Sequence, residues 1–469
     1  MPPHLNDPIS PASQNERLER STRRFRGIAA AAASALLGRG LNLLVNAATV
    51  PLTIRYLGSE GYGLWVTISS AVTMFFVLDI GIASTLTNLI SEAYAKSDRE
   101  KASTAFATAF WLVMAITACL GLLGWALWPH VHWSFLFHVR DQRLARLTSP
   151  AMAAAFVVFI CALPAGLATR ILAGYQELHT ANLFAAGGSV CSLIAIIAVI
   201  HFQGGLPLLV ALYAGSAAGA NLICLIWICL FHKPWLKPRL SLIRRRLVGG
   251  IFHSGSQFFV IQIAGLVVFN SDNLVISHFL SPGQVTPYNV TWRLVNYLTA
   301  IQVLVFPALW PAYSEAHAKG DLAWIRTTYA KYRIITIASL ALGCVILAGF
   351  GQRIIRLWAG PAAVPPMILV LLMCVWMIIY AFTTNQSCLM GATARVKKQA
   401  IFSLIGAIVN LTLSVIWVRT LGVVGVLLGT IVSYLLFVVI PAALEVRYIL
   451  QGKLLTAAPA TASDPNFVD

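Results

Sequence analysis

The chain has little charge and few acidic residues. Asp, Glu, Lys and Arg make up only 10% of its 469 residues, and 16 acidic side chains stand against 33 basic ones. Hydrophobic residues make up 58%, and the mean hydropathy is +0.79. Because soluble domains carry about 25% charged residues, this balance excludes a cytosolic enzyme, a nucleic-acid-binding protein and a disordered chain. It predicts an integral membrane protein.

Motifs for covalent chemistry or metal binding are also missing. The sequence has no Gly-rich phosphate loop, no G-x-S-x-G turn, no H-E-x-x-H pair and no C-x-x-C pair. All eight cysteines fall inside apolar runs, which favours neither a disulfide framework nor a zinc site. We interpret His130, His132 and His138 as loop residues. We therefore expect no enzyme, no catalytic residue, no metal and no bound cofactor.

The apolar residues form twelve runs, each close to the roughly 20 residues that cross a bilayer as a helix. Lipid offers no partners to backbone N–H and C=O groups, and the runs lack the strict alternation of barrel strands. The expected fold is therefore all-α. The runs lie near 28–54, 63–87, 103–128, 149–172, 181–202, 207–231, 248–278, 287–312, 330–350, 364–388, 398–418 and 421–444.

The basic residues predict the orientation of these helices. With a cytoplasmic N-terminus, 24 Lys and Arg residues fall in cytoplasmic segments and 7 in outer loops, as the positive-inside rule requires. Both termini are then cytoplasmic. The predicted parts are a disordered basic tail (1–27), a six-helix bundle (28–231), a basic cytoplasmic linker (232–247), a second six-helix bundle (248–445) and a cytoplasmic tail (446–469).

An internal repeat relates the two bundles. The octapeptides at 91–98 and 314–321 share six of eight residues, and each closes the second predicted helix of its bundle. Six helices, an even number, separate the two copies, so both bundles have the same orientation in the membrane. This pattern predicts a pseudo-two-fold axis along the membrane normal, a plan on which some alternating-access transporters are built.

Several stretches of Gly, Pro and aromatic residues resemble a known family. The segment 53–65, which continues through 79–81, resembles the N-terminal signature of the Wzx-type polysaccharide flippases. These flippases belong to the multidrug/oligosaccharidyl-lipid/polysaccharide exporter superfamily. Segments 307–321, 356–360 and 422–430 support the resemblance, which covers most of the chain from 28 to 445.

The resemblance implies a function for a bacterial inner-membrane protein. Such flippases move undecaprenyl-diphosphate-linked oligosaccharide repeat units from the cytoplasmic to the outer leaflet by alternating access, for cell-surface polysaccharide biosynthesis. The implied partners are this lipid-linked oligosaccharide, membrane lipids, and polysaccharide polymerase and glycosyltransferase machinery, with no nucleic acid and a monomeric protein. Coupling to protons or sodium ions is the implied energy source.

Two other functions are open at this stage. A multidrug exporter of the same superfamily would share the fold and couple drug export to a cation, but would carry more intramembrane acidic residues. A polysaccharide polymerase or ligase is less favoured. The longest predicted outer loop, near 129–148, has no paired carboxylates.

Charged residues inside the predicted helices are the first candidates for a translocation site, because an unpaired charge at mid-bilayer costs at least about 2.5–3.5 kcal/mol. Four qualify: Arg39, Asp79, Asp272 and Arg293. Counting from the outer turns places Arg39 level with Asp79, and Asp272 level with Arg293, on adjacent antiparallel helices. We expect two Arg–carboxylate pairs, which either lock helices together or exchange the carboxylate for a substrate anion or a coupling ion.

Further candidates surround these pairs. Arg55, Arg353 and Arg356 are expected in an outer vestibule, where they would supply a positive field. The alternative is a substrate head that is less anionic than is usual in the family. Possible sugar contacts are Asn270, Asn273, Trp292 and Trp310, although Trp at membrane interfaces is common without any sugar.

Overall fold

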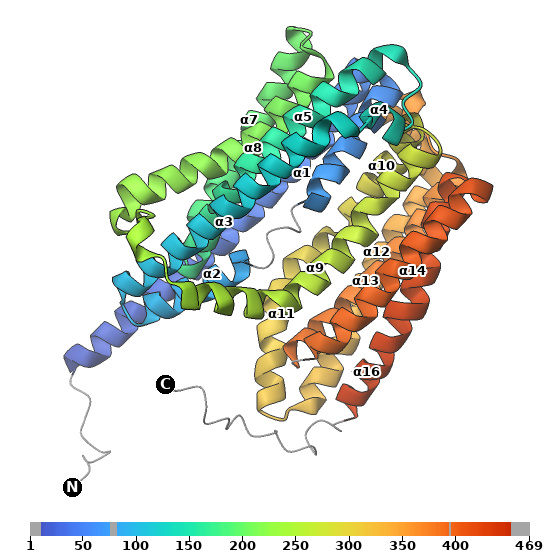
Figure 1. The fold of residues 1–469 in the computed structure, drawn as a ribbon. Helices are drawn as coiled ribbons and strands as arrows, with labels where there is room; N and C mark the ends of the chain where they lie inside the picture. The colour runs from blue at the N-terminus through green and yellow to red at the C-terminus, as the bar shows by residue number, and fades with distance from the viewer. Residues whose placement is uncertain (1–10, 76–81, 394, 452–469) are drawn as a thin grey trace.

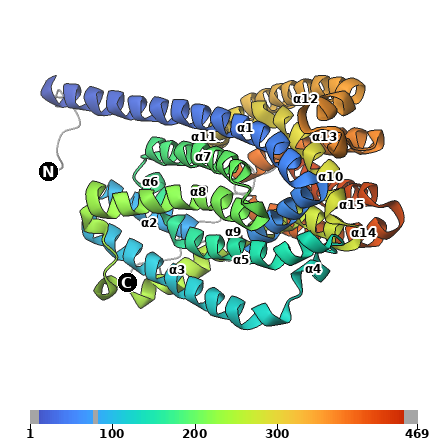
Figure 2. The same cartoon turned by 90° about the horizontal axis from the view of Figure 1, so that it is seen from above.

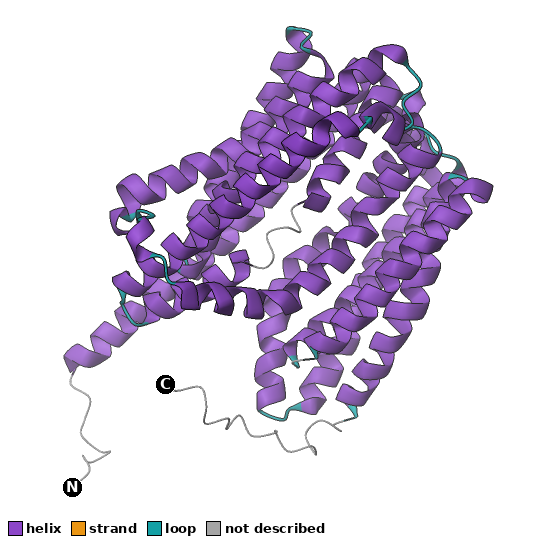
Figure 3. Ribbon diagram, in the orientation of Figure 1, coloured by secondary structure: helices purple, strands orange, loops and turns teal. Residues whose placement is uncertain are grey.

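A computed structural model of the chain describes residues 11–75, 82–393 and 395–451, and all regular structure in these ranges is helical (Figures 1 and 3). The first lobe contains α1 (Pro11–Phe75), α2 (Ile82–Ala95), α3 (Arg99–Leu127), α4 (Trp133–Leu136), α5 (Gln142–Ala165), α6 (Leu167–Gly174), α7 (Leu178–His201) and α8 (Gly205–Trp227). The second contains α9 (Arg245–Phe279), α10 (Pro282–Asn296), α11 (Ala300–Ala318), α12 (Leu322–Ala359), α13 (Met367–Ala392), α14 (Val396–Leu421), α15 (Val423–Tyr434) and α16 (Ile440–Leu450).

These helices account for the predicted membrane spans. Eight segments of the described chain are long and apolar enough to cross a membrane: 99–130, 142–174, 178–201, 205–232, 322–359, 367–392, 398–421 and 423–450. The other four predicted spans lie in α1, in the end of α1 with α2, in α9, and in α10 with α11. The chain is thus a multi-pass membrane protein, and the prediction of an all-α fold of about twelve spanning helices in two bundles is confirmed.

The first helix is longer than predicted at its N-terminal end. Helix α1 begins at Pro11 and runs through residues 11–27, where the sequence predicts a disordered tail. Glu, Arg and Leu are good helix formers, and no Gly or Pro interrupts residues 12–26, so the helix continues beyond the bundle (Figure 2). The helix is interrupted at Gly58, whose φ of 74° marks the turn between the first two spans.

The repeated octapeptide builds the same turn in both lobes. Its seventh residue has a positive φ in each copy, 55° at Ser97 and 72° at Gly320. Its eighth residue caps the next helix, because Asp98 and Asp321 each accept a hydrogen bond from the backbone N–H three residues later, at 2.8 and 3.0 Å. The repeat therefore encodes a helix end, a tight turn and the start of the following helix.

The two lobes converge at one end, here called the joined end, and separate toward the other, the terminal end, on whose side α1 begins and α16 ends (Figure 1). At the joined end α1 and α10 touch through their backbones. A Cβ built on Gly63 would lie 1.7 Å from the carbonyl oxygen of Pro282. The hydroxyl of Thr286 donates to the carbonyl oxygen of Ser59 at 2.5 Å, and that of Tyr62 donates to Asn289 Oδ1 at 3.2 Å. No side chain larger than hydrogen fits at Gly63.

A loop of the first lobe adds a second attachment at the joined end. Ser277 Oγ and His278 Nδ1, at the end of α9, donate hydrogen bonds to the carbonyl oxygens of Phe137 and Leu136 at 3.0 and 2.7 Å. These two acceptors lie in and just after α4. The predicted outer loop near 129–148 thus contacts the second lobe.

The apolar cores follow the same division between the two ends. At the joined end one cluster of buried residues includes both lobes, with Tyr62 and Leu64 from the first and Val285 and Met373 from the second. At the terminal end the described residues form two separate clusters. One lies within the first lobe around Phe106, and the other lies within the second lobe.

Charged residues tie the predicted basic linker to the terminal end of the first lobe. Glu177 accepts hydrogen bonds from Lys233 at 2.8 Å and bonds His232 at 2.7 Å, and Lys233 lies 4.2 Å from the centre of the Tyr175 ring. Burial raises the pKa of Glu177, but the bonds from Lys233 and His232 outweigh it and hold the pKa below its ordinary value. The linker is therefore ordered in this region.

Candidate functional site

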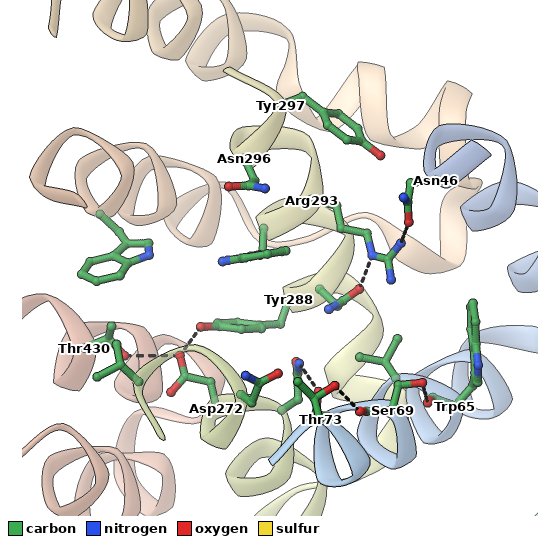
Figure 4. A pocket seen from close by; sticks show the side chains of 18 of the residues that line it. Asn46, Trp65, Ser69, Thr73, Asp272, Tyr288, Arg293, Asn296, Tyr297 and Thr430 are labelled. Atoms are coloured by element: carbon green, nitrogen blue, oxygen red, sulfur yellow. Dashed lines mark hydrogen bonds between the residues drawn. The ribbon is translucent and has the colours of Figure 1, made fainter. Parts of the chain in front are cut away.

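A polar cavity of about 440 Å³ lies between the lobes, close to the joined end (Figure 4). Helices α1 and α8 form its wall in the first lobe, and α9, α10, α13 and α15 form the opposite wall. Its lining is unusual for a membrane protein, because six asparagines contribute to it: Asn42, Asn46, Asn270, Asn273, Asn289 and Asn296. Six aromatic rings complete the walls: Trp65, Tyr213, Tyr288, Trp292, Tyr297 and Trp376.

Helical spacing explains why these polar groups face one cavity. Asn42 and Asn46 are four residues apart on α1, and Asn46 Nδ2 donates to Asn42 Oδ1 at 2.7 Å. On α10, Asn289, Arg293 and Asn296 are separated by four and three residues, which places them on one face of the helix. Two polar stripes thus oppose each other across the boundary between the lobes.

Arg293 is held by amides from both lobes. Its Nε donates to Asn289 Oδ1 at 2.9 Å, and its Nη1 donates to Asn46 Oδ1 at 3.3 Å. A guanidinium has five N–H donors, so these bonds use two and leave donors available to a ligand. The charge is fixed by neutral groups and by no carboxylate among the described residues. This is an arrangement suited to an incoming anion.

Asp272 lies at the other side of the cavity and is only 5% exposed. Its Oδ2 accepts hydrogen bonds from the hydroxyls of Tyr288 at 2.5 Å and Thr430 at 3.3 Å, whereas its Oδ1 has no partner. Next to it, Asn273 Nδ2 donates to Ser70 Oγ at 2.9 Å and its Oδ1 is likewise without a partner. Two buried acceptors at this wall therefore lack donors.

The predicted pair of Asp272 with Arg293 is wrong. The two residues bond to different partners, and the ring of Tyr288 lies between them (Figure 4). The chain turns at Ser281, so Tyr288 is nearer than Arg293 to the depth of Asp272 and reaches the carboxylate first. Counting residues from the turn gives the approximate depth of a side chain but not the direction in which it points.

The other predicted site residues have mixed outcomes. Asp79 lies outside the described residues, and of Arg39 only the backbone within α1 is described, so this pair stays a prediction. Arg55, Arg353 and Arg356 are exposed, and none of them belongs to the described lining of the cavity.

The predicted sugar contacts divide in the same way. Asn270, Asn273 and Trp292 line the cavity, but Trp310 does not. Its ring packs against α13, so closely that a Cβ on Gly391 would lie 1.9 Å from it. The indole is therefore a packing element of α11.

Asn46, Asn289 and Thr430, which hold or contact the two charged groups, were not among the predicted site residues. For Asn46 a signal was present, because Asn42 and Asn46 are two amides four residues apart in an apolar stretch of α1. No group of three or more His, Cys, Asp and Glu side chains that could bind a metal occurs in the described part of the chain.

Comparisons with known proteins give a consistent family. A family model described as polysaccharide biosynthesis protein matches residues 27–317. The chain is 21% identical over 414 residues to a putative O-antigen export protein of Yersinia pseudotuberculosis, covering 87% of this chain and 93% of that protein. It is 25% identical over 405 residues to a putative O-antigen transporter of Salmonella typhimurium, covering 84% and 90%.

A solved structure has the same fold. The lipid II flippase MurJ, in an inward closed conformation, superposes with a TM-score of 0.71 at 13% identity, covering 89% of this chain and 87% of that one. The family match spans more than half of the chain, from its first span into α11. The chain therefore belongs to the polysaccharide biosynthesis protein family, and its predicted relation to the Wzx-type flippases of the multidrug/oligosaccharidyl-lipid/polysaccharide exporter superfamily is confirmed.

Proposed function

We propose that this protein translocates undecaprenyl-diphosphate-linked oligosaccharide repeat units from the cytoplasmic to the outer leaflet of a bacterial inner membrane, for cell-surface polysaccharide biosynthesis. The observation that carries the proposal is the cavity between the lobes. It offers amides and aromatic rings, which suit sugars, beside an Arg293 guanidinium with free donors, which suits a diphosphate. The family match and the O-antigen relatives support the same substrate class.

The proposed work is physical transfer and not bond chemistry. Each polar group of a sugar diphosphate that loses its hydrogen bonds in hydrocarbon costs several kcal/mol, whereas the polyprenyl tail is stable in lipid. The cavity replaces water around the head group, and the tail stays in the bilayer. Opening of the joined end with closure of the terminal end then exposes the head group to the other side. The protein acts as a transporter and not as an enzyme.

The proposed orientation combines the sequence with the fold. The 24 to 7 excess of basic residues supports cytoplasmic termini. Because α1 begins and α16 ends on the side of the terminal end (Figure 1), that end would face the cytoplasm and the joined end would face outward. Single cysteines in a cysteine-free background test this in intact cells. The loop 232–247 should be protected from an impermeant maleimide and the loop 129–148 should react, and the reverse pattern would overturn the orientation.

Energy coupling is assigned to Asp272. It is the one carboxylate in the described lining of the cavity, and its Oδ1 has no hydrogen-bond partner. A proton or a sodium ion would bind Asp272 only while no substrate is bound. The protein works as a monomer alongside glycosyltransferases and a polysaccharide polymerase, which make and extend the exported units.

Two alternatives fit the cavity less well. A multidrug exporter that binds organic cations would place an unpaired guanidinium in its own binding site, where it repels the substrate. A polymerase or ligase needs a catalytic loop on the outer side, but residues 133–139 fold into the short helix α4 and its hydrogen bonds to the second lobe.

Deletion of the gene tests the proposed function. Cells without the protein should stop displaying the surface glycan and should retain lipid-linked oligosaccharide on the cytoplasmic leaflet. The wild-type gene should restore display, and an Arg293→Gln gene should not, at equal protein level in the membrane. Normal glycan display with increased drug sensitivity would contradict the proposal and favour the multidrug exporter.

A further inference from the structure

The charge balance of the cavity has a consequence for the kind of glycan that fits. Among its described lining residues there is one guanidinium, on Arg293, and one carboxylate, on Asp272. The remaining polar lining consists of neutral amides and hydroxyls. A cavity built to hold an acidic oligosaccharide together with a diphosphate would need several cations, and the exposed Arg55, Arg353 and Arg356 are not part of this lining.

The two charges also lie at different places in the cavity. Arg293 is anchored to Asn46 and Asn289, between α1 and α10, whereas Asp272 is anchored to Tyr288 and Thr430, between α9, α10 and α15. The Tyr288 ring separates them (Figure 4). The cavity thus has a donor side, which attracts an anion, and an acceptor side, which repels one.

The acceptor side is short of hydrogen-bond donors. Asp272 and Asn273 are 5% and 7% exposed, and each has a side-chain oxygen without a partner. A buried acceptor without a donor is costly, so a ligand group that donates would be stabilised here. Sugar hydroxyls donate, whereas a sugar carboxylate only accepts and carries the same charge as Asp272.

We infer that the cavity is bipolar and selects a lipid-linked oligosaccharide whose sugars are uncharged, with the diphosphate at Arg293 and the hydroxyls of a neutral sugar at Asp272 and Asn273. This inference rests on the proposed function and names the substrate class within it. A uronic acid or another acidic sugar in the same position would face the carboxylate of Asp272 across a low-dielectric cavity.

The test uses two matched probes and the full-length protein in proteoliposomes. One probe is an undecaprenyl-diphosphate-linked trisaccharide of neutral hexoses. The other is identical except that one hexose carries a carboxylate at C6. The wild-type protein should translocate the neutral probe at least about tenfold faster, which is the size of effect expected for one unfavourable charge contact. Equal rates, or faster transport of the acidic probe, would overturn the inference while leaving the proposed function intact. Transport of neither probe would contradict the proposed function itself.

A variant with an added positive charge in the cavity should transport the acidic probe better than the wild type does. Asn296→Arg places a second cation on the α10 face of the cavity and should bring the two rates within about threefold of each other. Gln142→Arg adds the same charge at the exposed start of α5, outside the cavity lining, and should keep the wild-type preference. If both variants keep it, the lining does not set the preference and the inference fails.

A measurement of equilibrium binding tests the selectivity without any coupling of transport to an ion gradient. Asp272→Asn should raise affinity for the acidic probe about tenfold, because that probe loses a repulsion, and should lower affinity for the neutral probe a few-fold, because its hydroxyls lose a charged acceptor. Binding is measured in detergent, where no ion gradient exists. An unchanged affinity for the acidic probe would contradict the acceptor side as the source of selectivity.

Discussion

The joined and terminal ends of the molecule are built differently. At the joined end a single apolar cluster contains residues of both lobes, and backbone contact at Gly63 brings the lobes as close as two helices can come. At the terminal end each lobe has its own cluster in the described chain, around Phe106 in the first and Tyr313 in the second. Each lobe thus has an apolar core of its own at the terminal end, whereas both lobes contribute to one core at the joined end.

This difference indicates how the molecule can change shape. A lobe that buries its own core at one end can move without unfolding, and small shifts at a packed interface are typical of rigid-body transitions. Hydrogen bonds between the lobes, such as that from Thr286 to Ser59, close the joined end. In the proposed cycle these contacts break when the substrate is released outward.

The largest expected effect comes from widening the joined end. Gly63→Ala puts a Cβ where the carbonyl oxygen of Pro282 already lies, 1.7 Å away, so the helices must separate. Overpacking of this kind costs about 1–3 kcal/mol, which shifts the equilibrium toward an open joined end by about tenfold or more. Maleimide labelling of a cysteine at the joined end should increase, and glycan export should fall.

Gly187→Ala is the matched control for this substitution. Gly187 lies on an exposed face of α7, and a Cβ there meets no atom within 4 Å. It should leave labelling and export unchanged. If Gly63→Ala behaves like this control, contact at the joined end does not set the conformational equilibrium.

The next effect tests the cavity between the two ends. Hydrogen bonds to a charged group contribute about 1.5–3 kcal/mol, so Arg293→Gln should lower export about tenfold or more at an unchanged protein level. Because Asp272 and Arg293 have separate partners, adding Asp272→Asn should not restore export. Rescue by the double substitution, measured as surface glycan per membrane-bound protein, would mean that the two charges pair during the cycle.

Hydropathy was enough to predict the helices. That signal is strong because an apolar run that crosses lipid must satisfy its own backbone hydrogen bonds, which a helix does. The repeat was equally informative, since Asp98 and Asp321 cap equivalent helices. Residues 11–27 were misjudged because polarity was taken for disorder, although their composition favours a helix.

The site was harder to predict than the fold. Depth in the membrane follows from counting residues, but the direction of a side chain depends on helix rotation and packing, which no single span determines. Tyr288 therefore occupies the place assigned to Arg293 beside Asp272. The amides Asn46 and Asn289 were overlooked because a neutral side chain costs little to insert and so does not stand out in a hydropathy profile.

A smaller effect should follow from removing a single hydrogen bond at the joined end. Tyr62→Phe keeps the buried ring and removes the hydroxyl that donates to Asn289 Oδ1 at 3.2 Å. One neutral hydrogen bond is worth about 0.5–1.5 kcal/mol, so labelling at the joined end should rise a few-fold, less than for Gly63→Ala. Tyr94→Phe, on an exposed ring of α2, is the control. If both variants responded equally, the Tyr62 hydroxyl would not stabilise the closed joined end.

The smallest effect belongs to the terminal end, where Glu177 ties the linker to the first lobe. The pKa of Glu177 is below its ordinary value of 4.5, because its bonds to Lys233 and His232 outweigh burial. A carboxylate with a lowered pKa stabilises the folded state above pH 4.5. This contribution is lost as the pH falls through the pKa that the carboxylate has in the folded protein. Since the side chain is 27% exposed, the contribution is about 1 kcal/mol or less. Glu177→Gln should therefore lower the melting temperature of the purified protein at neutral pH by a degree or two. In acid, the melting temperatures of variant and wild type should lie closer together.

Glu315→Gln is the control, because it removes one member of a fully exposed pair with Lys319. It should not measurably change the melting temperature at neutral or at acid pH. If the two variants melt alike at every pH, the Glu177 cluster does not hold the linker to the lobe.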